Sequence, residues 1–387
     1  MSQPDKGGAR LMKREHQRRE LAPLLAIALV LVGLSAASLL TPDRAFSPNE
    51  NRYLQQRPEL TWTTLMDGTF TKKAEDYTAD QIALRDMWME SASVVQRAAG
   101  RLEVNDTWMG RDGRYFAKVT PDTFDAAQYE KNLAQVRTFF DANADKDCRV
   151  MMVPTPAYLL RDDLPANAPL FDAESCFDTL LADFAAEAID LRAALTPDAA
   201  EMYYRTDHHW TTAGALLGYQ CYRAALGLSV PDEADFTVEE YPGFRGTLYS
   251  KVLDANAPTD TVMLYRQPGD TGWSVRYDNT DHAGCYDTAK LAQKDMYEVF
   301  FGGNWPTVTV RGGAENGRRL LVLKDSYANA LLPFAAADYE EIVAVDLRYY
   351  LGSLSELMQQ EGITDLLVLY STSSFIADPK IDRLALG

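Results

Sequence analysis

From residue 124 onward, short apolar runs alternate with amphipathic segments. Apolar residues recur at spacings of three and four over residues 124–143, which predicts a helix. Buried strands that alternate with helices indicate an α/β fold with a mostly parallel sheet. The expected strands cover residues 149–153, 202–204, 320–323, 342–345 and 366–370, and the other expected helices cover residues 180–188, 212–226, 328–337 and 354–360.

The longest apolar stretch, residues 21–40, contains no charged side chain. Twenty residues at ~1.5 Å each span ~30 Å, the thickness of a bilayer's hydrocarbon core. Residues 1–20 hold six basic and three acidic side chains, so the positive-inside rule keeps this stub in the cytoplasm. The stretch exceeds the ~7–15 apolar residues of a signal peptide. We therefore predict a single-pass anchor at the cell membrane with the rest of the chain exported; the alternative is secretion after cleavage near residues 35–38.

The exported part divides into regions of different composition. Residues 41–110 are mixed and polar and are interpreted as an extracytoplasmic stalk or cap. Residues 110–116 form an Asp-Gly turn that leads into a short strand. The main domain is expected over residues 111–387. Within it, residues 230–310 are rich in Gly, Pro and Asp and are interpreted as an insertion over the site.

Composition and charge narrow the function. With 47% hydrophobic residues, the chain has enough apolar area for a core, so a largely disordered protein is excluded. The net charge of −18 conceals a basic stub, a neutral anchor and a remainder with 32 basic and 53 acidic side chains. Such an acidic domain repels phosphate backbones, so nucleic acid is not an expected partner.

The four cysteines, Cys148, Cys176, Cys221 and Cys285, form no CxxC pair. This spacing disfavours a zinc knuckle or a thioredoxin-like site. In an exported domain they are compatible with two disulfides or with buried free thiols.

Titratable residues cluster after the expected strand at 202–204. Asp207, His208 and His209 are adjacent, and His282 is the only other histidine of the exported part. In an extended segment residues i and i+2 face the same way, so Asp207 is predicted to hydrogen-bond His209 while His208 points to the opposite side. Asp-His-His also suits zinc or iron, although further ligands at a recognisable spacing are missing. A purely structural role for these histidines is a third interpretation.

A second cluster follows the expected strand at 320–323, where Lys324-Asp325-Ser326 leads directly into a helix. This arrangement places the Ser326 hydroxyl at an elbow, near backbone N–H groups that can stabilise an anionic intermediate. The competing interpretation is a simple N-cap. Taken together, the two clusters favour Ser326 as nucleophile, His209 as base and Asp207 as the group that orients the base.

These two motifs, Asp207-His208-His209-Trp210 and Lys324-Asp325-Ser326-Tyr327, resemble those of the DHHW family, which is similar to the alginate O-acetyltransferase type of SGNH hydrolase-like proteins. The resemblance covers nearly all of residues 45–375. Weaker support comes from residues 49–52, 85–86, 110–116, 244–251 and 345–350.

The resemblance implies a three-layer α/β/α SGNH hydrolase-like (flavodoxin-like) fold and a triad of Ser326, His209 and Asp207. Ordinary SGNH esterases carry the serine first, whereas here Asp-x-His precedes it by more than a hundred residues, as in a permuted arrangement. The glycine and asparagine motifs that supply oxyanion donors in ordinary SGNH esterases are not recognisable in this sequence. Gly303 and Asn304 are candidate replacements, and Arg348 is a candidate for binding an anionic substrate.

The resemblance also implies the activity. We expect an extracytoplasmic O-acetyltransferase, or an acetylesterase if water is the acceptor, that acts on a cell-surface polysaccharide. A membrane-bound acyl-exporting partner would supply the acyl groups, and neither a cofactor nor a metal is expected. The alternative is a non-catalytic anchored module that binds polysaccharide or serves as a scaffold.

Overall fold

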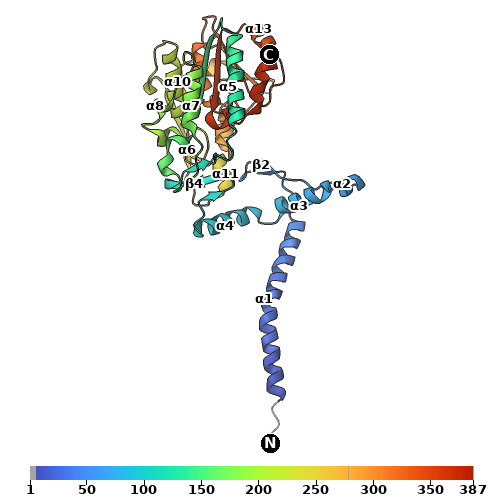
Figure 1. Ribbon diagram of the computed structural model, residues 1–387. Coiled ribbons are helices and arrows are strands. Elements are labelled where there is room, and N and C mark those ends of the chain that lie inside the picture. The colour runs from blue at the N-terminus through green and yellow to red at the C-terminus, as the bar shows by residue number, and fades with distance from the viewer. Residues whose placement is uncertain (1–5, 278, 387) are drawn as a thin grey trace. The chain divides into compact units, whose positions relative to one another are not determined.

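The computed structural model describes residues 6–277 and 279–386. The chain divides between Val95 and Gln96 into two compact units (Figure 1). The predicted stalk at residues 41–110 spans most of the first unit and the beginning of the second. Each unit is described separately below.

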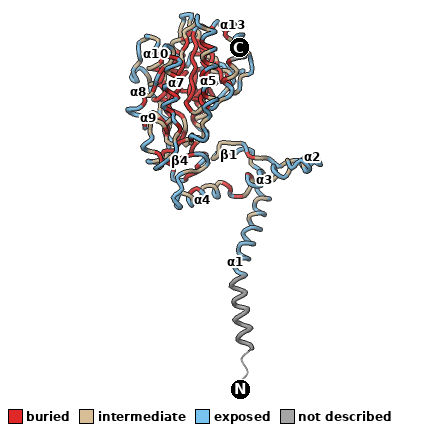
Figure 2. Tube along the Cα trace, viewed as in Figure 1, coloured by how far each residue is buried: buried red, intermediate tan, exposed pale blue. Residues whose placement is uncertain are grey.

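The first unit begins with the long helix α1, Lys6–Leu40. Residues Leu21–Leu40 have a mean hydropathy of 2.4, and α1 is the one helix of the described residues long and apolar enough to span a membrane. Most side chains of this stretch are exposed (Figure 2). The unit continues with β1 (Phe46–Ser47), β2 (Arg52–Tyr53), α2 (Trp62–Met66), α3 (Thr69–Gln81) and most of α4 (Arg85–Ala98).

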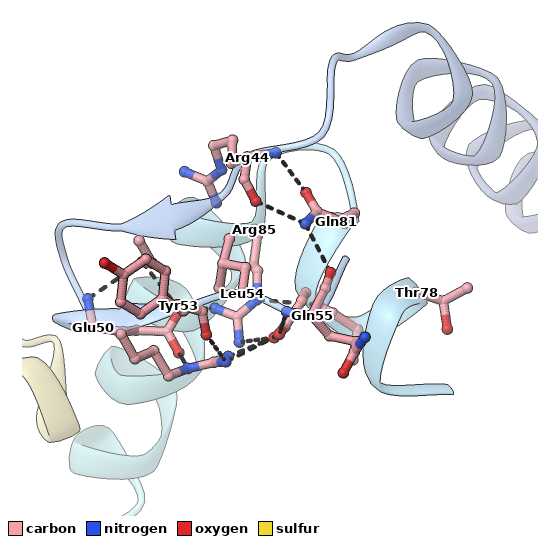
Figure 3. A network of polar contacts seen from close by, with 12 residues as sticks. Arg44, Glu50, Tyr53, Leu54, Gln55, Thr78, Gln81 and Arg85 are labelled. Atoms are coloured by element: carbon pink, nitrogen blue, oxygen red, sulfur yellow. Dashed lines mark hydrogen bonds and ion pairs between the residues drawn. The ribbon is translucent and has the colours of Figure 1, made fainter. Parts of the chain in front are cut away.

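Polar contacts hold the strands β1 and β2 against α3 and α4 (Figure 3). The Gln81 side chain accepts from the Arg44 backbone N–H at 2.9 Å and donates to the Arg44 carbonyl, also at 2.9 Å. Arg85 forms an ion pair with Glu50, and Arg52 donates to Asp80 with both terminal nitrogens. Side-chain hydrogen bonds therefore replace much of an apolar core in this unit.

The second unit is built on a seven-stranded sheet in the order β10-β9-β11-β13-β12-β14-β6. The strands β13, β12, β14 and β6 are parallel, whereas β11, β9 and β10 pair antiparallel. Their bounds are β6 Asp147–Val153, β9 Ser274–Tyr277, β10 Thr280–Ala283, β11 Thr307–Arg311, β12 Arg319–Lys324, β13 Glu341–Val345 and β14 Asp365–Ser371.

Helices cover both faces of this sheet. Alternate residues of β12 enter different cores: Leu320 and Val322 pack on one face, Leu321 and Leu323 on the other. The first core includes residues of α10 (Thr212–Ala225) and α12 (Ala328–Ala335). The second core includes residues of α5 (Ala126–Asp141), α7 (Ala173–Asp183) and α13 (Leu354–Glu361). This three-layer α/β/α arrangement confirms the predicted fold class.

The remaining elements surround this core. A three-stranded sheet contains β3 (Glu103–Val104), β4 (Thr107–Met109) and β5 (Tyr115–Ala117), and a separate hairpin contains β7 (Thr237–Phe244) and β8 (Asp260–Arg266). The short helices are α6 (Pro156–Leu159), α8 (Arg192–Leu195), α9 (Ala199–Met202), α11 (Thr247–Val252) and α14 (Thr372–Phe375).

Most expected strands exist, but the one at residues 202–204 is wrong. Met202 ends α9, and Tyr203 makes only an isolated antiparallel bridge to Trp210. The chain turns back on itself at this point, so the apolar run is buried without joining the sheet. The segment at residues 230–310 is divided: β7 and β8 form their own hairpin, whereas β9 and β10 extend the main sheet. All four cysteines carry free thiols.

Candidate active site

The candidate site lies at the carboxyl end of the parallel strands, where α/β sheets commonly bind ligands. Ser326 follows β12 directly, in the turn before α12. Asp207 and His209 belong to the loop between α9 and α10. All three side chains are nearly or fully buried, with Ser326 retaining 9% of its accessible surface.

Ser326, His209 and Asp207 are hydrogen-bonded in series. His209 Nε2 lies 2.7 Å from Ser326 Oγ, and His209 Nδ1 lies 2.5 Å from Asp207 Oδ1. The carboxylate can only accept, so His209 Nδ1 carries the proton and Nε2 is free to accept the Ser326 hydroxyl proton. Asp207 Oδ1 also accepts from the His209 backbone N–H at 2.9 Å. The arrangement has the geometry of a nucleophile, a base and an orienting acid.

The second oxygen of Asp207 is held by Thr247. Asp207 Oδ2 accepts from the Thr247 backbone N–H at 2.7 Å and from its hydroxyl at 2.9 Å. The neighbouring Gly246 makes this approach possible. A Cβ atom at that position would lie 2.2 Å from Asp207 Oδ2 and 2.3 Å from Asp207 Cβ. Residues 244–251 are among the stretches that resemble the DHHW family, but no pattern in them indicates that they hold Asp207 in place.

The loop that carries Asp207 is fixed from the hairpin β7–β8. Asp260, the first residue of β8, accepts from the backbone N–H groups of Arg205 and Thr206 at 3.1 and 3.0 Å. The Thr206 hydroxyl donates to the same carboxylate and accepts from the Gly246 backbone N–H at 3.2 Å. Long-range hydrogen bonds, and not strand pairing, therefore set the position of Asp207.

His208 does not point away from its neighbours, as an extended segment would require. The loop is bent, and the His208 ring lies 3.8 Å from the His209 ring. His208 Nδ1 contacts the Thr247 hydroxyl at 2.7 Å. Because this hydroxyl donates its proton to Asp207, His208 must donate through Nδ1, which leaves Nε2 as its acceptor. His208 and His209 are thus both connected to Asp207.

Electrostatics keep this cluster in a defined protonation state. Burial opposes ionisation of Asp207, but the electrostatic interactions with His209 and His208 and the hydrogen bonds outweigh it, so the pKa of the carboxyl lies well below its usual range. Burial and the neighbouring His209 lower the pKa of His208 to about 4. At neutral pH, Asp207 is therefore a carboxylate and His208 is uncharged.

Two tyrosines complete the surroundings of His209, and of these the sequence motifs contain only Tyr327. The Tyr297 ring stacks on the imidazole at 3.8 Å with an interplanar angle of 7°, and its hydroxyl donates to the Ser326 carbonyl at 3.1 Å. Tyr327 donates to the His208 carbonyl and accepts from the Trp210 indole at its own carbonyl. Tyr297 lies in a short 3₁₀ turn with no recognisable motif, so only the structure locates it.

Asp325 and Lys324 have structural surroundings of their own. Asp325 accepts from the Tyr327 backbone N–H at 2.9 Å and from the backbone N–H and hydroxyl of Ser371 at 2.9 and 2.8 Å. These bonds connect the turn at Ser326 to the end of β14. Lys324 is fully buried, and within the described residues its ammonium has no hydrogen-bond partner. Burial lowers the pKa of Lys324 to about 8.

The structure ties the oxyanion candidates to α12 but leaves Arg348 paired. Asn329, three residues after Ser326, donates to the Asn304 side-chain oxygen at 3.1 Å and to the Gly303 carbonyl at 3.4 Å. Arg348 donates to both oxygens of Asp346, at 2.8 and 2.6 Å. Its guanidinium is therefore largely neutralised within the protein, which weakens it as a binding group for an anionic substrate.

Asp207, His208 and His209 also place ligand atoms within 4.8 Å of one another, so a metal site has to be considered. Both ring nitrogens of His209 and both oxygens of Asp207 are already hydrogen-bonded. A metal would have to displace these bonds, and within the described part of the chain the cluster offers only three donor groups. These donors fit a hydrogen-bonded cluster with Ser326 better than a metal centre.

Comparisons with known proteins agree with the motifs and the fold. The model of the DHHW protein family matches residues 195–345, and that of the SGNH hydrolase-like domain of acetyltransferase AlgX matches residues 104–242. Among solved structures, a DHHW family protein from Eubacterium siraeum is 22% identical with a TM-score of 0.62, covering 74% of this chain and 96% of its own. PatB1 of Bacillus cereus with a sulfonyl adduct is 22% identical with a TM-score of 0.60, covering 70% and 96%. These structural likenesses show a shared fold. No curated protein matches the sequence.

Proposed function

We propose that this chain, which carries a DHHW domain in an SGNH hydrolase-like fold, is a membrane-anchored O-acetyltransferase acting outside the cytoplasm on a cell-surface polysaccharide. One observation carries the proposal: the continuous hydrogen bonding from Ser326 Oγ through His209 to Asp207. The match to an acetyltransferase domain model supports acyl transfer. The apolar stretch of α1 supports the anchor, and the excess of basic residues before it supports a cytoplasmic N-terminus.

The proposed reaction proceeds in two halves. Ser326 Oγ attacks the carbonyl carbon of an acetyl donor, and its proton passes to His209 Nε2, while Asp207 stabilises the resulting imidazolium. The donor's leaving group departs with that proton and leaves an acetyl ester on Ser326. A glycan hydroxyl then gives its proton to His209 and takes the acetyl group, and the Ser326 oxygen receives that proton from His209 as it leaves. If water takes the place of the glycan, the same residues catalyse ester hydrolysis.

The developing oxyanion needs hydrogen-bond donors. We propose the Ser326 backbone N–H and a group from Gly303 or Asn304, which Asn329 holds next to α12. Losing one such donor typically costs ~10²–10³ in rate. The acyl supply would come from a membrane-bound acyl-exporting partner, which the anchor brings close.

Mass spectrometry of the exported part after incubation with a chromogenic acetyl ester tests the proposal. We expect an acetyl adduct on Ser326, and in Ser326→Ala a fall in kcat on the order of 10⁶-fold with an unchanged melting temperature. Ser373→Ala is the matched control, because this serine lies at the same edge of the sheet and contacts Ser371, not a histidine. Unchanged turnover in Ser326→Ala would refute the triad. A chain that binds glycan but forms no acyl adduct and does not react with a fluorophosphonate would support the non-catalytic alternative.

A further inference from the structure

The helix α4, most of which belongs to the first unit, exposes its apolar side and buries its polar side. Its outward side carries Met87, Trp88, Val94 and Val95, and Leu84 lies in the turn just before it; together we call these residues the apolar stripe of residues 84–95. Met87 and Trp88 are followed seven residues later by Val94 and Val95, which places both pairs on one face of the helix, with the exposed Ser91 between them. Their exposed fractions lie between 44% and 66%. Large apolar side chains gathered on one exposed face are unfavourable in water, so an apolar environment is expected to cover them.

The polar side of the same helix packs inward. Arg85 is buried and forms an ion pair with Glu50, and Asp86 accepts a two-pronged contact from Arg44 at 3.0 and 3.1 Å. Ser93 is also buried. The helix cannot turn its stripe inward without breaking these contacts. The apolar side therefore faces out because the polar side is already occupied.

The stripe begins beside the end of the apolar span. The Ala83 backbone N–H donates to Ser38 Oγ in the last turn of α1 at 2.9 Å, and the Trp88 indole donates to the Ala83 carbonyl at 3.2 Å. Ser38 lies two residues before the end of α1, a rise of roughly 3 Å. Trp88 is thus at the level where the span ends, and tryptophan is enriched at the membrane–water interface. Figure 1 shows residues 85–95 running across the direction of α1.

From this geometry we propose that the apolar stripe of residues 84–95 lies in the outer interface of the lipid bilayer, as a second membrane contact next to α1. The inference rests on the proposed anchor. Lipid is favoured over a protein partner because the stripe continues directly from the span. Residues Leu84 to Val95 include a single basic side chain, Arg85, which is already paired. The contact is therefore hydrophobic and should not depend on anionic lipid or on salt.

Tryptophan fluorescence of the full chain in phosphatidylcholine vesicles tests this placement. The acyl chains carry bromine at a shallow position and quench only side chains that reach them. The experiment uses a Trp62→Phe background, because Trp62 is the other strongly exposed tryptophan. We expect bromolipid to quench the fluorescence, and Trp88→Phe to abolish this quenching. Salt at ~0.5 M, which screens interactions between surface charges, should leave the quenching unchanged.

A pair of neighbouring substitutions provides a second readout. Val95→Glu places a carboxylate on the stripe, and we expect the emission of Trp88 to shift to longer wavelength with less quenching. Gln96→Glu is the matched control, because Gln96 accepts from Arg101 at 3.1 Å and a carboxylate there keeps that partner. The control should leave quenching unchanged.

The remaining outcomes overturn the inference in distinguishable ways. Trp88 quenched by aqueous iodide but not by bromolipid means that the stripe lies in water. Protection from both quenchers means that protein, either a second copy or another partner, covers it. Flotation of the vesicles after alkaline extraction reports the anchor separately. A chain that fails to float refutes the proposed anchor, whereas a chain that floats without quenching refutes only the placement of the stripe.

Discussion

Gly246 offers a sharp test of how Asp207 is seated. Replacing it with alanine would place a Cβ atom 2.2 Å from Asp207 Oδ2, whereas ordinary contacts begin at 3.4 Å. Asp207 is fully buried and hydrogen-bonded on both oxygens, so it cannot move aside without losing those bonds. The carboxylate or the backbone at position 246 must shift by about 1 Å. Overpacking of this kind costs about 1–3 kcal/mol in the free energy of unfolding.

The effect of Gly246→Ala on activity should exceed its effect on stability. A displacement of about 1 Å in a catalytic group costs about 10²-fold in rate. We therefore expect kcat for ester turnover to fall by about 10²-fold, with KM nearly unchanged because the group moved is not expected to bind the donor. Stopped-flow measurement of acyl-enzyme formation and denaturant unfolding would report the two effects separately.

Gly272→Ala is the matched control, because no heavy atom would lie within 4 Å of its new Cβ. It should retain full activity and stability. Native rates together with a native unfolding midpoint in Gly246→Ala would refute the reasoning. In that case Asp207 would not depend on the close approach of the backbone at position 246.

Further predictions concern the neighbours of Asp207. Thr247→Val removes the hydroxyl that donates to Asp207, and a hydrogen bond to a charged group is worth about 1.5–3 kcal/mol. We therefore expect kcat to fall by about 10- to 100-fold. Thr247→Ser keeps the hydroxyl and should retain the native kcat. His208 has a pKa lowered to about 4, so the unfolded chain binds more protons between that value and about pH 6.5, and stability should decrease as the pH falls through this window. The side chain is about one-third exposed, and solvent screening reduces the effect. We therefore expect the free energy of unfolding to be about 1–2 kcal/mol lower at pH 4.5 than at pH 7, and this difference should be absent in His208→Gln. Lys324→Met removes a buried ammonium for which the described residues provide no hydrogen-bond partner. The free energy of unfolding, measured by calorimetry, should stay level or rise by about 1–3 kcal/mol. A clear decrease would show that the ammonium makes a stabilising interaction in the folded protein.

The strands that sequence patterns identified are those buried on both faces. β6, β12, β13 and β14 consist of continuous apolar runs, and such runs report burial locally. The strands β9, β10 and β11 were missed because their exposed sides carry polar residues and their segments are rich in turns. Their place in the sheet depends on pairing with distant segments, which no local pattern encodes.

The orientation of His208 shows the same limit at the level of a single side chain. Alternation along an extended strand predicted that it faces away from Asp207 and His209. The loop is instead bent by hydrogen bonds to Asp260 and Thr247, residues that lie some 40 to 55 positions later. The identity of the reactive side chains was readable, whereas their mutual orientation was not.

By itself, the sequence determined the apolar span, the α/β class and the two motifs that contain Asp207, His209 and Ser326. These features depend on residue type and on periodicity over a few residues. Only the tertiary structure decided that Ser326 Oγ meets a histidine 117 positions away at 2.7 Å, that Gly246 lets the backbone approach Asp207, and that α4 turns its apolar side outward. The physical reason is that these arrangements depend on long-range hydrogen bonds and on which side of each element is already occupied. A local pattern states a preference for burial, but the fold determines which preferences are met.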